Sequence, residues 1–414
     1  MSAIKEIEQR IDTLLVDPEI ARLIPGLETV IEFTSPTGRL NIQISSGSIG
    51  ATPATGSASI VLDASEGVWE EILKYPPAPT YHSFTALQLA NDGFSVDGDP
   101  LAVAQARPVL ERIFELLVSV PAMQAPVGKR NLRQVAGHYI PIEIGGVTYE
   151  IYYEEAGRGT PVLFLHTAGA DGRQFLPQLS DIELAKTHRL IAVDLPYHGR
   201  SLPPQDWDGS PYKLTSDTYM NWCSAIIENV VGDRAIVAGG SMGAAMSMVL
   251  AAARPEQLLG IIAIEPPFRS KGRKNPFQHH TSVHGSLHNS SYVRGIMSPL
   301  SPQASRRRAS WIYSQGAPGI YPGDLSFYSE EFDGAVTAPK IDAARTPVVL
   351  LSGDYDYSAT PADGAKLADL IPGSHHIIME GLGHFPMCEH PDHFRSFLVE
   401  ALDLIDRDLS RLKS

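Results

Sequence analysis

Apolar and polar positions follow two different patterns along the chain, and the change between them divides it in two. In the first part, short apolar and β-branched runs alternate with Gly, Ser and Pro, which is typical of strands, while longer amphipathic runs predict helices. The predicted strands span residues 28–34, 39–45 and 58–63. The predicted helices fall within residues 1–15, 63–75 and 99–120. This mixture predicts an α+β domain over residues 1–122.

From residue 138 onward, strand and helix patterns alternate regularly. A hairpin turned at Gly145-Gly146 comes first, and five apolar runs without internal alternation follow, separated mostly by helical segments. Such runs are typical of buried strands, so we expect a mostly parallel sheet flanked by helices over residues 138–414. The buried strands are expected at 161–166, 189–196, 234–240, 259–267 and 347–354. Residues 123–137, rich in Pro, Gly and basic side chains, predict a linker.

Residues 268–340 interrupt this alternation with a long segment rich in aromatic residues, Pro and Gly. Long insertions in compact domains usually cover active sites, so the segment predicts a cap. Its aromatic side chains are candidates to line an apolar substrate pocket, although such side chains also form the core of a cap. These candidates are Trp311, Tyr313, Tyr321, Phe327 and Tyr328.

The stretch "AIVAGGSMGAAMS", residues 235–247, places Ser241 between glycines at the end of a predicted strand and the start of a helix. A G-x-S-x-G turn of this kind presents a serine hydroxyl free of its own backbone, and small neighbours let strand and helix approach closely. A phosphate-binding loop is the alternative, but the lysine and the glycine spacing of such loops are missing. We therefore expect Ser241 to be a nucleophile.

A base and an acid follow Ser241 in the chain, as this type of nucleophile needs. His384, in "GLGHFPMCEHP", lies in a Gly-rich loop after a short apolar run, where its imidazole can reach Ser241. "LLSGDYDYSATP" offers Asp354 and Asp356 just after a buried strand, and one of them is expected to orient His384. His390 is expected to be a surface or capping residue.

Together with "LFLHTAGAD" and "VDLPYHGRS", these motifs resemble the α/β-hydrolase superfamily over residues 138–410. The resemblance implies that Asp356 is the triad acid and that the backbone N–H groups of Met242 and Ala168 form an oxyanion hole. The family's usual His-Gly pair is His166-Thr167 here, which leaves the geometry of that loop open. Besides Trp311 and Tyr313, we expect His166, Thr167 and Phe385 to contact the substrate, although a structural role for His166 is equally simple.

The first 120 residues resemble the sterol-carrier-protein-2-like lipid-binding domain in their order of elements and in the short motif "DGFSVDGDP" at 92–100. The resemblance implies a sheet and helices around an apolar tunnel, and hence bound lipid. The alternative is a module that only packs or forms a homodimer, since apolar strands more often form a core than a ligand cavity.

The amino-acid composition argues against several classes of binding partner for this protein. A net charge of −14 argues against nucleic acid, and no apolar run is long enough for a transmembrane segment. Two distant cysteines suggest neither disulfides nor a thiolate metal site, so we expect a cytoplasmic protein. His280, His284 and His288 would share a helix face, but no carboxylate is near them in sequence, so we predict no metal site. No cofactor is expected either.

These observations predict a serine hydrolase that cleaves a carboxylic ester, thioester or lactone of an apolar, aromatic or lipid-like substrate. A carbon–carbon hydrolase acting on a vinylogous diketone would use the same three residues. An alternative of another class is a lipid carrier whose hydrolase-like half is catalytically idle.

Overall fold

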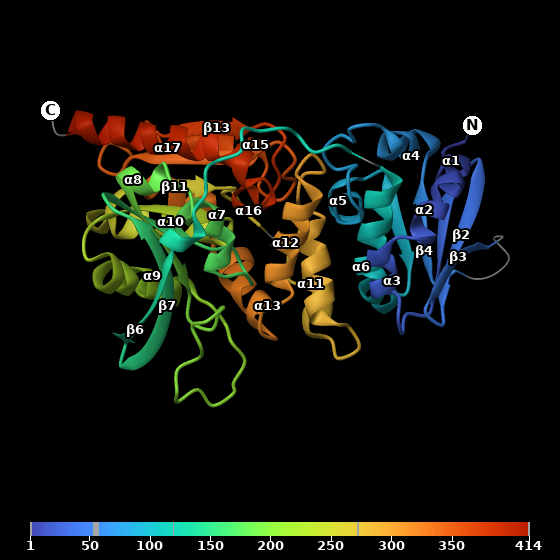
Figure 1. Cartoon of the computed structure of the whole chain (residues 1–414), viewed down its shortest axis with the longest axis horizontal. Coiled ribbons are helices and arrows are strands. Elements are labelled where there is room, and N and C mark those ends of the chain that lie inside the picture. Colours follow the sequence, from blue (N-terminus) through green and yellow to red (C-terminus); the bar gives the residue numbers. More distant parts are fainter. Residues whose placement is uncertain (1, 53–57, 119, 271–272, 413–414) are drawn as a thin grey trace. The chain divides into compact units, whose positions relative to one another are not determined.

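The computed structural model describes residues 2–52, 58–118, 120–270 and 273–412. The chain divides into two compact units (Figure 1). Unit 1 comprises Met1–Met123 and Pro276–Gln303, and unit 2 comprises Gln124–Asn275 and Ala304–Ser414. This division differs from the predicted one, in which all of residues 268–340 belonged to the second domain. Residues 271–272 of that insertion lie outside the described residues.

Unit 1 is built on a five-stranded sheet with the order β3-β2-β1-β4-β5. β1 and β4 are parallel, and the other neighbours are antiparallel. The three predicted strands are confirmed as β1, β2 and β4, whereas β3 was not predicted because Ile49 is its only large apolar residue. The strands are β1 (Thr29–Ser35), β2 (Gly38–Ser45), β3 (Ser48–Thr52), β4 (Ile60–Ala64) and β5 (Phe94–Gly98).

Four α-helices of unit 1, namely α3, α4, α5 and α6, begin at side chains that cap their free N–H groups. Asp17 accepts hydrogen bonds from the backbone of Glu19 and Ile20, and Asp99 accepts one from Leu101; a proline follows each aspartate at the first helical position. The helices are α1 (Ala3–Arg10), α2 (Asp12–Leu15), α3 (Pro18–Leu23), α4 (Glu66–Leu73), α5 (Phe84–Ala90), α6 (Pro100–Leu117), the short 3₁₀ helix η5 (Pro276–His279) and α11 (Gly285–Arg294).

Aromatic rings fill the interior of unit 1 between sheet and helices. Trp69 lies at their centre, with ring centroids 5.7 Å from Phe33 and 5.6 Å from Phe94, and its Nε1 donates to the carbonyl of Thr34 at 2.9 Å. Phe114 of α6 stacks on the same tryptophan at 6.3 Å. These residues form a packed core, and the lipid tunnel implied by the sterol-carrier resemblance stays a prediction.

Helix α11, from the insertion, is an integral part of unit 1. The Ser83 hydroxyl donates to the carbonyl of Gly295 at 2.6 Å, and His288 Nδ1 lies 3.1 Å from the carbonyl of Ala104 in α6. A Cβ at Gly295 would lie 2.6 Å from both Thr85 and Glu111, so the backbone of this segment approaches the core as closely as glycine allows. Side chains from distant parts of the sequence therefore form one hydrophobic unit.

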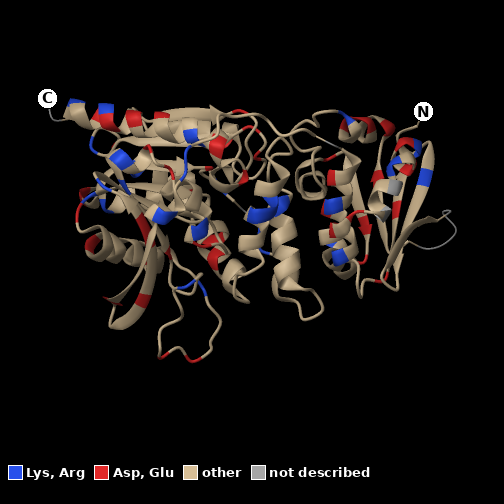
Figure 2. Cartoon of the chain, in the orientation of Figure 1, with Lys and Arg blue, Asp and Glu red and all other residues tan. Residues whose placement is uncertain are grey.

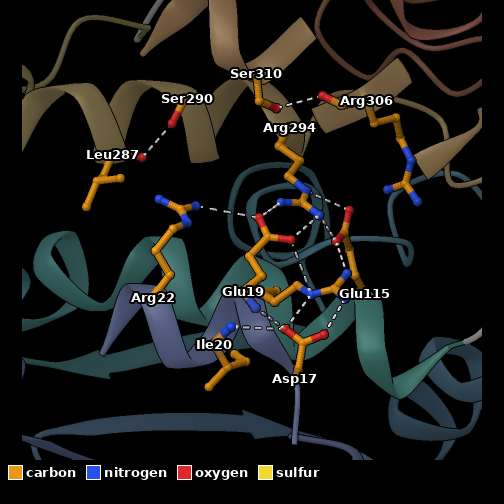
Figure 3. A network of polar contacts seen from close by, with 11 residues as sticks. Asp17, Glu19, Ile20, Arg22, Glu115, Leu287, Ser290, Arg294, Arg306 and Ser310 are labelled. Carbon is orange, nitrogen blue, oxygen red and sulfur yellow. Dashed lines mark hydrogen bonds and ion pairs between the residues drawn. The ribbon is translucent and has the colours of Figure 1, made fainter. Parts of the chain in front are cut away.

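A buried network of ion pairs joins α3, α6 and α11 (Figure 3). Arg112 pairs with Asp17 at 2.6 Å and with Glu115 at 2.9 Å. Arg294 of α11 pairs with Glu115 and with Glu19. Two guanidinium groups thus share three carboxylates, which fixes α11 to unit 1 by charge as well as by packing.

Unit 2 contains an eight-stranded sheet with the order β13-β12-β11-β10-β8-β9-β7-β6 (Figure 1). β6 and β7 form the predicted antiparallel hairpin, and β8 to β13 are parallel to one another. The predicted buried strands are confirmed. The strands are β6 (Ala136–Ile144), β7 (Val147–Gly157), β8 (Thr160–Leu165), β9 (His188–Asp194), β10 (Ala235–Gly240), β11 (Leu258–Ile264), β12 (Val348–Gly353) and β13 (His375–Met379).

Helices cover both faces of this sheet. On one face α9 packs against α10, which is connected to α15 through α14, and on the other face α7 packs against both α8 and α17. None of the helices in the described ranges is long and apolar enough to cross a lipid bilayer. The helices are α7 (Leu176–Leu179), α8 (Leu184–Thr187), α9 (Ser216–Ile226), α10 (Met242–Ala253), α12 (Gln303–Tyr313), α13 (Ile320–Leu325), α14 (Gly334–Thr337), α15 (Pro361–Leu370), α16 (Pro386–Glu389) and α17 (Pro391–Leu412). Shorter 3₁₀ and π segments are η1 (Leu132–Gln134), η2 (Gly172–Phe175), η3 (Ile227–Val231), η4 (Pro255–Gln257), η6 (Ser326–Glu331) and η7 (Ala338–Lys340).

The C-terminal part of the predicted linker is held against unit 2. The backbone N–H of Gly128 donates to Asp392 at 2.9 Å, and Arg130 pairs with the same carboxylate at 2.6 Å. Asn131 N–H donates to the carbonyl of Ser180 at 2.7 Å. The chain is therefore anchored to unit 2 several residues before β6 begins.

Candidate active site

Ser241 occupies a strained turn between β10 and α10. Its φ of +51° is rare for a residue with a side chain, and its backbone N–H is held by the carbonyl of Ile264 at 2.8 Å. A Cβ at Gly239 would lie 2.1 Å from the backbone of Gly243, and one at Gly243 would lie 2.4 Å from the carbonyl of Leu165. The glycines are therefore required by the close approach of strand and helix.

Three side chains from different loops meet in this turn. His384 Nε2 lies 2.8 Å from Ser241 Oγ, and His384 Nδ1 lies 2.5 Å from Asp356 Oδ2. All three residues are almost completely buried. With the ring proton on Nδ1 facing Asp356, Nε2 is free to accept the serine proton, which is the arrangement that general-base activation requires.

Asp356 is held as an ion by its surroundings. Burial alone would raise the pKa of Asp356, but its electrostatic interaction and hydrogen bond with His384, together with the backbone of Ser358, lower it below its usual value. The N–H groups of Ser358 and Ala359 donate to Oδ1 at 2.7 and 3.1 Å. Asp354 instead accepts a hydrogen bond from the N–H of Gly381 at 2.7 Å. The geometry thus brings Asp356 rather than Asp354 to His384.

Two further buried acids support these loops. Glu265 follows β11 with a φ of +54°, and both its carboxyl oxygens lie 2.9 Å from the N–H of Gly353. Glu389 accepts hydrogen bonds from the N–H groups of Gly383 and Phe385, at 2.7 and 3.2 Å, on either side of His384. Burial, and then the charge of Asp356, raises the pKa of Glu265 well above its usual value, which favours the neutral form of this acid. The sequence analysis missed both acids, although an acid directly after a buried strand, as in "IIAIEPP", was a usable signal.

The loop after β8 lies beside Ser241 and provides the second candidate oxyanion donor. Ala168 is buried there, and Met242 begins α10, where N–H groups have no carbonyl partner within the helix. The N–H of Thr167 donates to Gln174 Oε1 at 3.0 Å, so Thr167 itself is occupied. Ala168 and Met242 therefore stay the candidate pair that the family resemblance implies.

His166 is fixed by backbone on both sides of its ring. Nδ1 lies 2.9 Å from the carbonyl of Thr167, and the N–H of Leu195 donates to Nε2 at 3.3 Å. Burial, followed by the charge of His198, lowers the pKa of His166 to about 4, so its ring is neutral with the proton on Nδ1. Both nitrogens are therefore used by the loop, which accords with a structural role.

Asp324 of α13 connects the cap to this loop. Its completely buried carboxylate accepts hydrogen bonds from the N–H of Gly169 at 2.7 Å and from Tyr212 Oη at 2.8 Å, and it pairs with His198 Nε2 at 2.9 Å. Burial alone would lower the pKa of His198, but the charge of Asp324 raises it. No motif marked Asp324, because its partners come from three separate stretches of sequence.

The predicted substrate-contacting aromatics lie in different environments. Tyr313 is buried, with its hydroxyl on Thr167 Oγ1, and its ring lies 5.4 Å from that of Phe385, which in turn packs against His384 at 4.9 Å. Trp311, two residues earlier on α12, is 63% exposed and lines a surface hollow instead. Tyr313 and Phe385 therefore lie beside the triad, whereas Trp311 lies on the outer side of α12.

Metal ligands do not gather in the described ranges: no group of three or more His, Cys, Asp or Glu side chains is arranged to hold an ion there. The prediction that His280, His284 and His288 share a helix face is wrong, because α11 begins only at Gly285 and His280 lies in the turn before it. Cys223 and Cys388 are buried, and burial raises the pKa of both thiols.

Two curated hydrolases are similar in sequence to more than half of this chain. A 2-(acetamidomethylene)succinate hydrolase of Mesorhizobium japonicum is 24% identical over 259 residues, covering 60% of this chain and 90% of the relative. A 2-hydroxy-6-oxo-6-(2'-aminophenyl)hexa-2,4-dienoic acid hydrolase of Metapseudomonas resinovorans is 24% identical over 295 residues, covering 64% and 91%.

Solved structures share the fold of unit 2. The enol-lactonase of Burkholderia xenovorans superposes with a TM-score of 0.54 at 20% identity, covering 64% of this chain and all of that one. An esterase of Thermogutta terrifontis gives the same score at 19% identity, covering 65% and 99%. The model of the Alpha/beta hydrolase family matches residues 162–394, which is more than half of the chain. The chain therefore belongs to the Alpha/beta hydrolase family and is a hydrolytic enzyme.

Proposed function

We propose that this enzyme is a serine hydrolase that cleaves a carboxylic ester, thioester or lactone through an acyl-enzyme. The observation that carries the proposal is the continuous chain from Ser241 Oγ through His384 to Asp356, with separations of 2.8 and 2.5 Å, at a strained strand-to-helix turn. Few structural roles would require this combination of a buried imidazole, a buried carboxylate and a serine whose backbone φ is positive.

In this proposal, Ser241 Oγ attacks the substrate carbonyl while His384 Nε2 takes its proton. The N–H groups of Met242 and Ala168 stabilise the oxyanion. His384 then gives the proton to the leaving oxygen or sulfur, and the acyl group stays on Ser241. A water molecule, deprotonated by the same imidazole, releases the acid and restores the serine. Asp356 holds the Nδ1 tautomer throughout.

The test is hydrolysis of 4-nitrophenyl esters of increasing chain length by wild type and by Ser241→Ala. The wild type should turn over at least one ester, and Ser241→Ala should lower kcat by about 10⁶-fold while the protein stays folded. Retained turnover in the variant would contradict the proposal, since another group would then carry the reaction.

A carbon–carbon hydrolase is the second candidate. It is favoured by the relative from Metapseudomonas resinovorans, whose name is that of a hexa-2,4-dienoic acid hydrolase. Product analysis separates the two reactions, because carbon–carbon cleavage leaves a ketone fragment and an acid, whereas ester cleavage leaves an alcohol. Incubation with both substrate types and mass spectrometry of the products decides between them.

We further propose that unit 1 either binds lipid, as its sterol-carrier resemblance implies, or serves as a homodimer contact. The enzyme is proposed to act in the cytoplasm, without a cofactor, on a fairly apolar small molecule. Native mass spectrometry of freshly purified protein tests both roles of unit 1, since bound lipid adds its own mass and a dimer doubles the total. A carrier with an idle scaffold would show lipid but no ester turnover.

A further inference from the structure

Two buried hydroxyl groups near Ser241 have no hydrogen-bond partner among the described residues. They are Tyr328 Oη and Ser270 Oγ, on residues that are 2% and 4% exposed. A buried polar group left without a partner is costly, so its persistence calls for an explanation. One explanation is that a bound molecule supplies the missing partner.

The position of Tyr328 fits that explanation. It lies on the π-helix η6, one turn beyond Asp324, whose carboxylate holds the loop of Ala168 and Gly169. π-helical segments frequently occur at functional sites because they displace a side chain from regular helical packing. The helix therefore carries Tyr328 to the same side of the cap that contacts the candidate oxyanion loop.

Charges around this hydroxyl favour an anionic partner. Burial raises the pKa of Tyr328. The positive charge of Arg273 and the nearby hydroxyls of Ser241 and Ser270 act against that rise. Neither serine hydroxyl, however, meets the geometry of a hydrogen bond with Tyr328 Oη. The negative charge nearby is that of Asp356, which is already paired with His384. A carboxylate of a bound ligand, placed here in addition to that of Asp356, would therefore meet two hydroxyl donors and the positive charge of a guanidinium group.

We propose that Tyr328 and Ser270, with Arg273, form a subsite for a carboxylate carried by the acyl part of the substrate. This inference rests on the proposed function and narrows it to esters, thioesters or lactones of acidic compounds. The two hydroxyls donate to the carboxylate oxygens, and Arg273 supplies the compensating charge.

The test compares mono(4-nitrophenyl) adipate with 4-nitrophenyl hexanoate, which have the same chain length and differ in the terminal carboxylate. Wild type should have the higher kcat/KM for the adipate. Tyr328→Phe and Ser270→Ala should each lower that preference about tenfold. The control is Tyr219→Phe, which removes another buried, unpartnered hydroxyl from the core and should leave the preference unchanged.

Thermal stability distinguishes this role from a structural one. Because its hydroxyl lacks a partner, Tyr328→Phe should keep or raise the Tm, whereas loss of a structural hydrogen bond would lower it. Equal kcat/KM for both esters in wild type, or an unchanged preference in both variants, overturns the subsite. Absence of any turnover by the wild type overturns the ester-hydrolase proposal itself, so the two failures are distinguishable.

A separate observation concerns the surface hollow of about 690 Å³ that Trp311 lines. Its volume is within the range of small-molecule pockets. Leu132 and Trp311, each 63% exposed, are among its apolar lining residues, and Arg133 and Arg308 carry its charge. Neither of these two arginine side chains forms an ion pair or hydrogen bond within the described part of the chain.

The charge of this hollow contrasts with that of the whole protein. The chain has a net charge of −14, yet four arginines and one acid line the hollow, and Figure 2 shows the basic band on α12. The other two arginines are neutralised, because Arg130 pairs with Asp392 and Arg173 with Asp171. Two uncompensated positive charges therefore stand beside exposed apolar side chains.

We infer that this hollow binds an amphipathic organic anion, with its acidic head on Arg133 and Arg308 and its apolar body against Trp311 and Leu132. Such a ligand matches both the charge and the apolar lining, whereas an inorganic anion would leave the apolar side chains in water.

The test is calorimetric titration with sodium octanoate and with 1-octanol. Octanoate should bind saturably and more tightly than octanol, and Arg133→Gln and Arg308→Gln should each weaken binding about five- to tenfold. The matched control is Arg345→Gln, an exposed arginine elsewhere in unit 2, which should not change the affinity. Equal affinity for octanol, no saturable binding, or unchanged affinity in both hollow variants overturns the inference.

Discussion

Both units of this enzyme bury clusters of acidic side chains, but they stabilise them differently. In unit 1, Asp17, Glu19 and Glu115 share the guanidinium groups of Arg112 and Arg294. Burial alone would raise the pKa of Glu19, but the hydrogen bond and charge of Arg294 lower it, and Arg112 does the same for Asp17. Each carboxylate has at least one guanidinium partner, so this cluster fixes the structure.

At the active site, the acids rely on backbone N–H groups and on one imidazole. Glu389 is held by the N–H groups around His384, burial favours the neutral form of Glu265, and the pKa of Asp356 beside His384 is lowered. A histidine can gain and lose a proton near neutral pH, whereas an arginine cannot. The comparison teaches that the partner of a buried acid decides whether a cluster holds charge in place or can move a proton.

The largest effect should follow from neutralising the acid that orients the imidazole. Asp356→Asn keeps the shape of the side chain but favours the wrong tautomer of His384, so kcat should fall about 10⁴-fold. Steady-state kinetics, beside a thermal melt to show that the fold is retained, measures this. A loss of less than tenfold would mean that Asp356 does not orient the imidazole.

The next largest effect should come from the ion-pair cluster of unit 1. Arg294→Met leaves Glu19 and Glu115 without their guanidinium partner and should lower the free energy of unfolding of unit 1 by about 3–5 kcal/mol. Arg22→Met is a matched control, because Arg22 faces the same Glu19 from an exposed position at 3.8 Å and should cost less than about 1 kcal/mol. Denaturant unfolding compares them, and equal losses would contradict the structural role of the buried pair.

A third effect concerns pH. Burial raises the pKa of Glu111 to about 7 in the folded state, despite hydrogen bonds from Thr85. Because the pKa of Glu111 is higher in the folded than in the unfolded protein, its contribution to the free energy of unfolding is complete below pH about 4.5. This contribution is lost as the pH rises through about 7, which lowers the free energy of unfolding by about 3 kcal/mol. Glu111→Gln should remove this slope from the unfolding free energy, whereas the exposed Glu70→Gln should keep it. If the free energy of unfolding of Glu111→Gln still falls between pH 4.5 and 7, another group causes the pH dependence.

The smallest effect should come from Glu265→Gln. Since burial favours the neutral form of Glu265, an amide of the same shape should preserve its contacts, and the activation free energy and the free energy of unfolding should each change by less than about 1 kcal/mol. Asp356→Asn is an equally conservative change in the same acid cluster, so the difference in kcat between the two variants shows which of the two acids must be charged. A large loss of kcat in Glu265→Gln would show that this carboxyl works as an ion.

Sequence patterns predicted the parts of the molecule that depend on local signals. The buried strands and the turn at Ser241 follow from apolar runs and motif spacing, whereas the choice of Asp356 as the partner of His384 came from the family resemblance. The features that were missed depend on contacts between distant segments. No local pattern reveals that Asp324 of the cap holds the loop at Gly169, or that α11 packs into unit 1.

Side-chain orientation was equally hard to predict. Trp311 and Tyr313 are two residues apart on one helix, so both seemed equivalent as pocket residues. A helical step of two residues points side chains in nearly opposite directions, which places Tyr313 against Thr167 and leaves Trp311 exposed. Which of the two faces inward depends on how the cap folds, and the sequence of the helix alone does not determine that.

The central claim is that His384 and Asp356 activate Ser241, and covalent labelling by a fluorophosphonate tests it most directly. Intact mass spectrometry of wild type, Ser241→Ala and His384→Ala gives the extent of labelling. The account predicts one adduct per wild-type chain, none on Ser241→Ala and strongly slowed labelling of His384→Ala. Folded wild type that stays unlabelled, or Ser241→Ala that labels as fast as wild type, would contradict it.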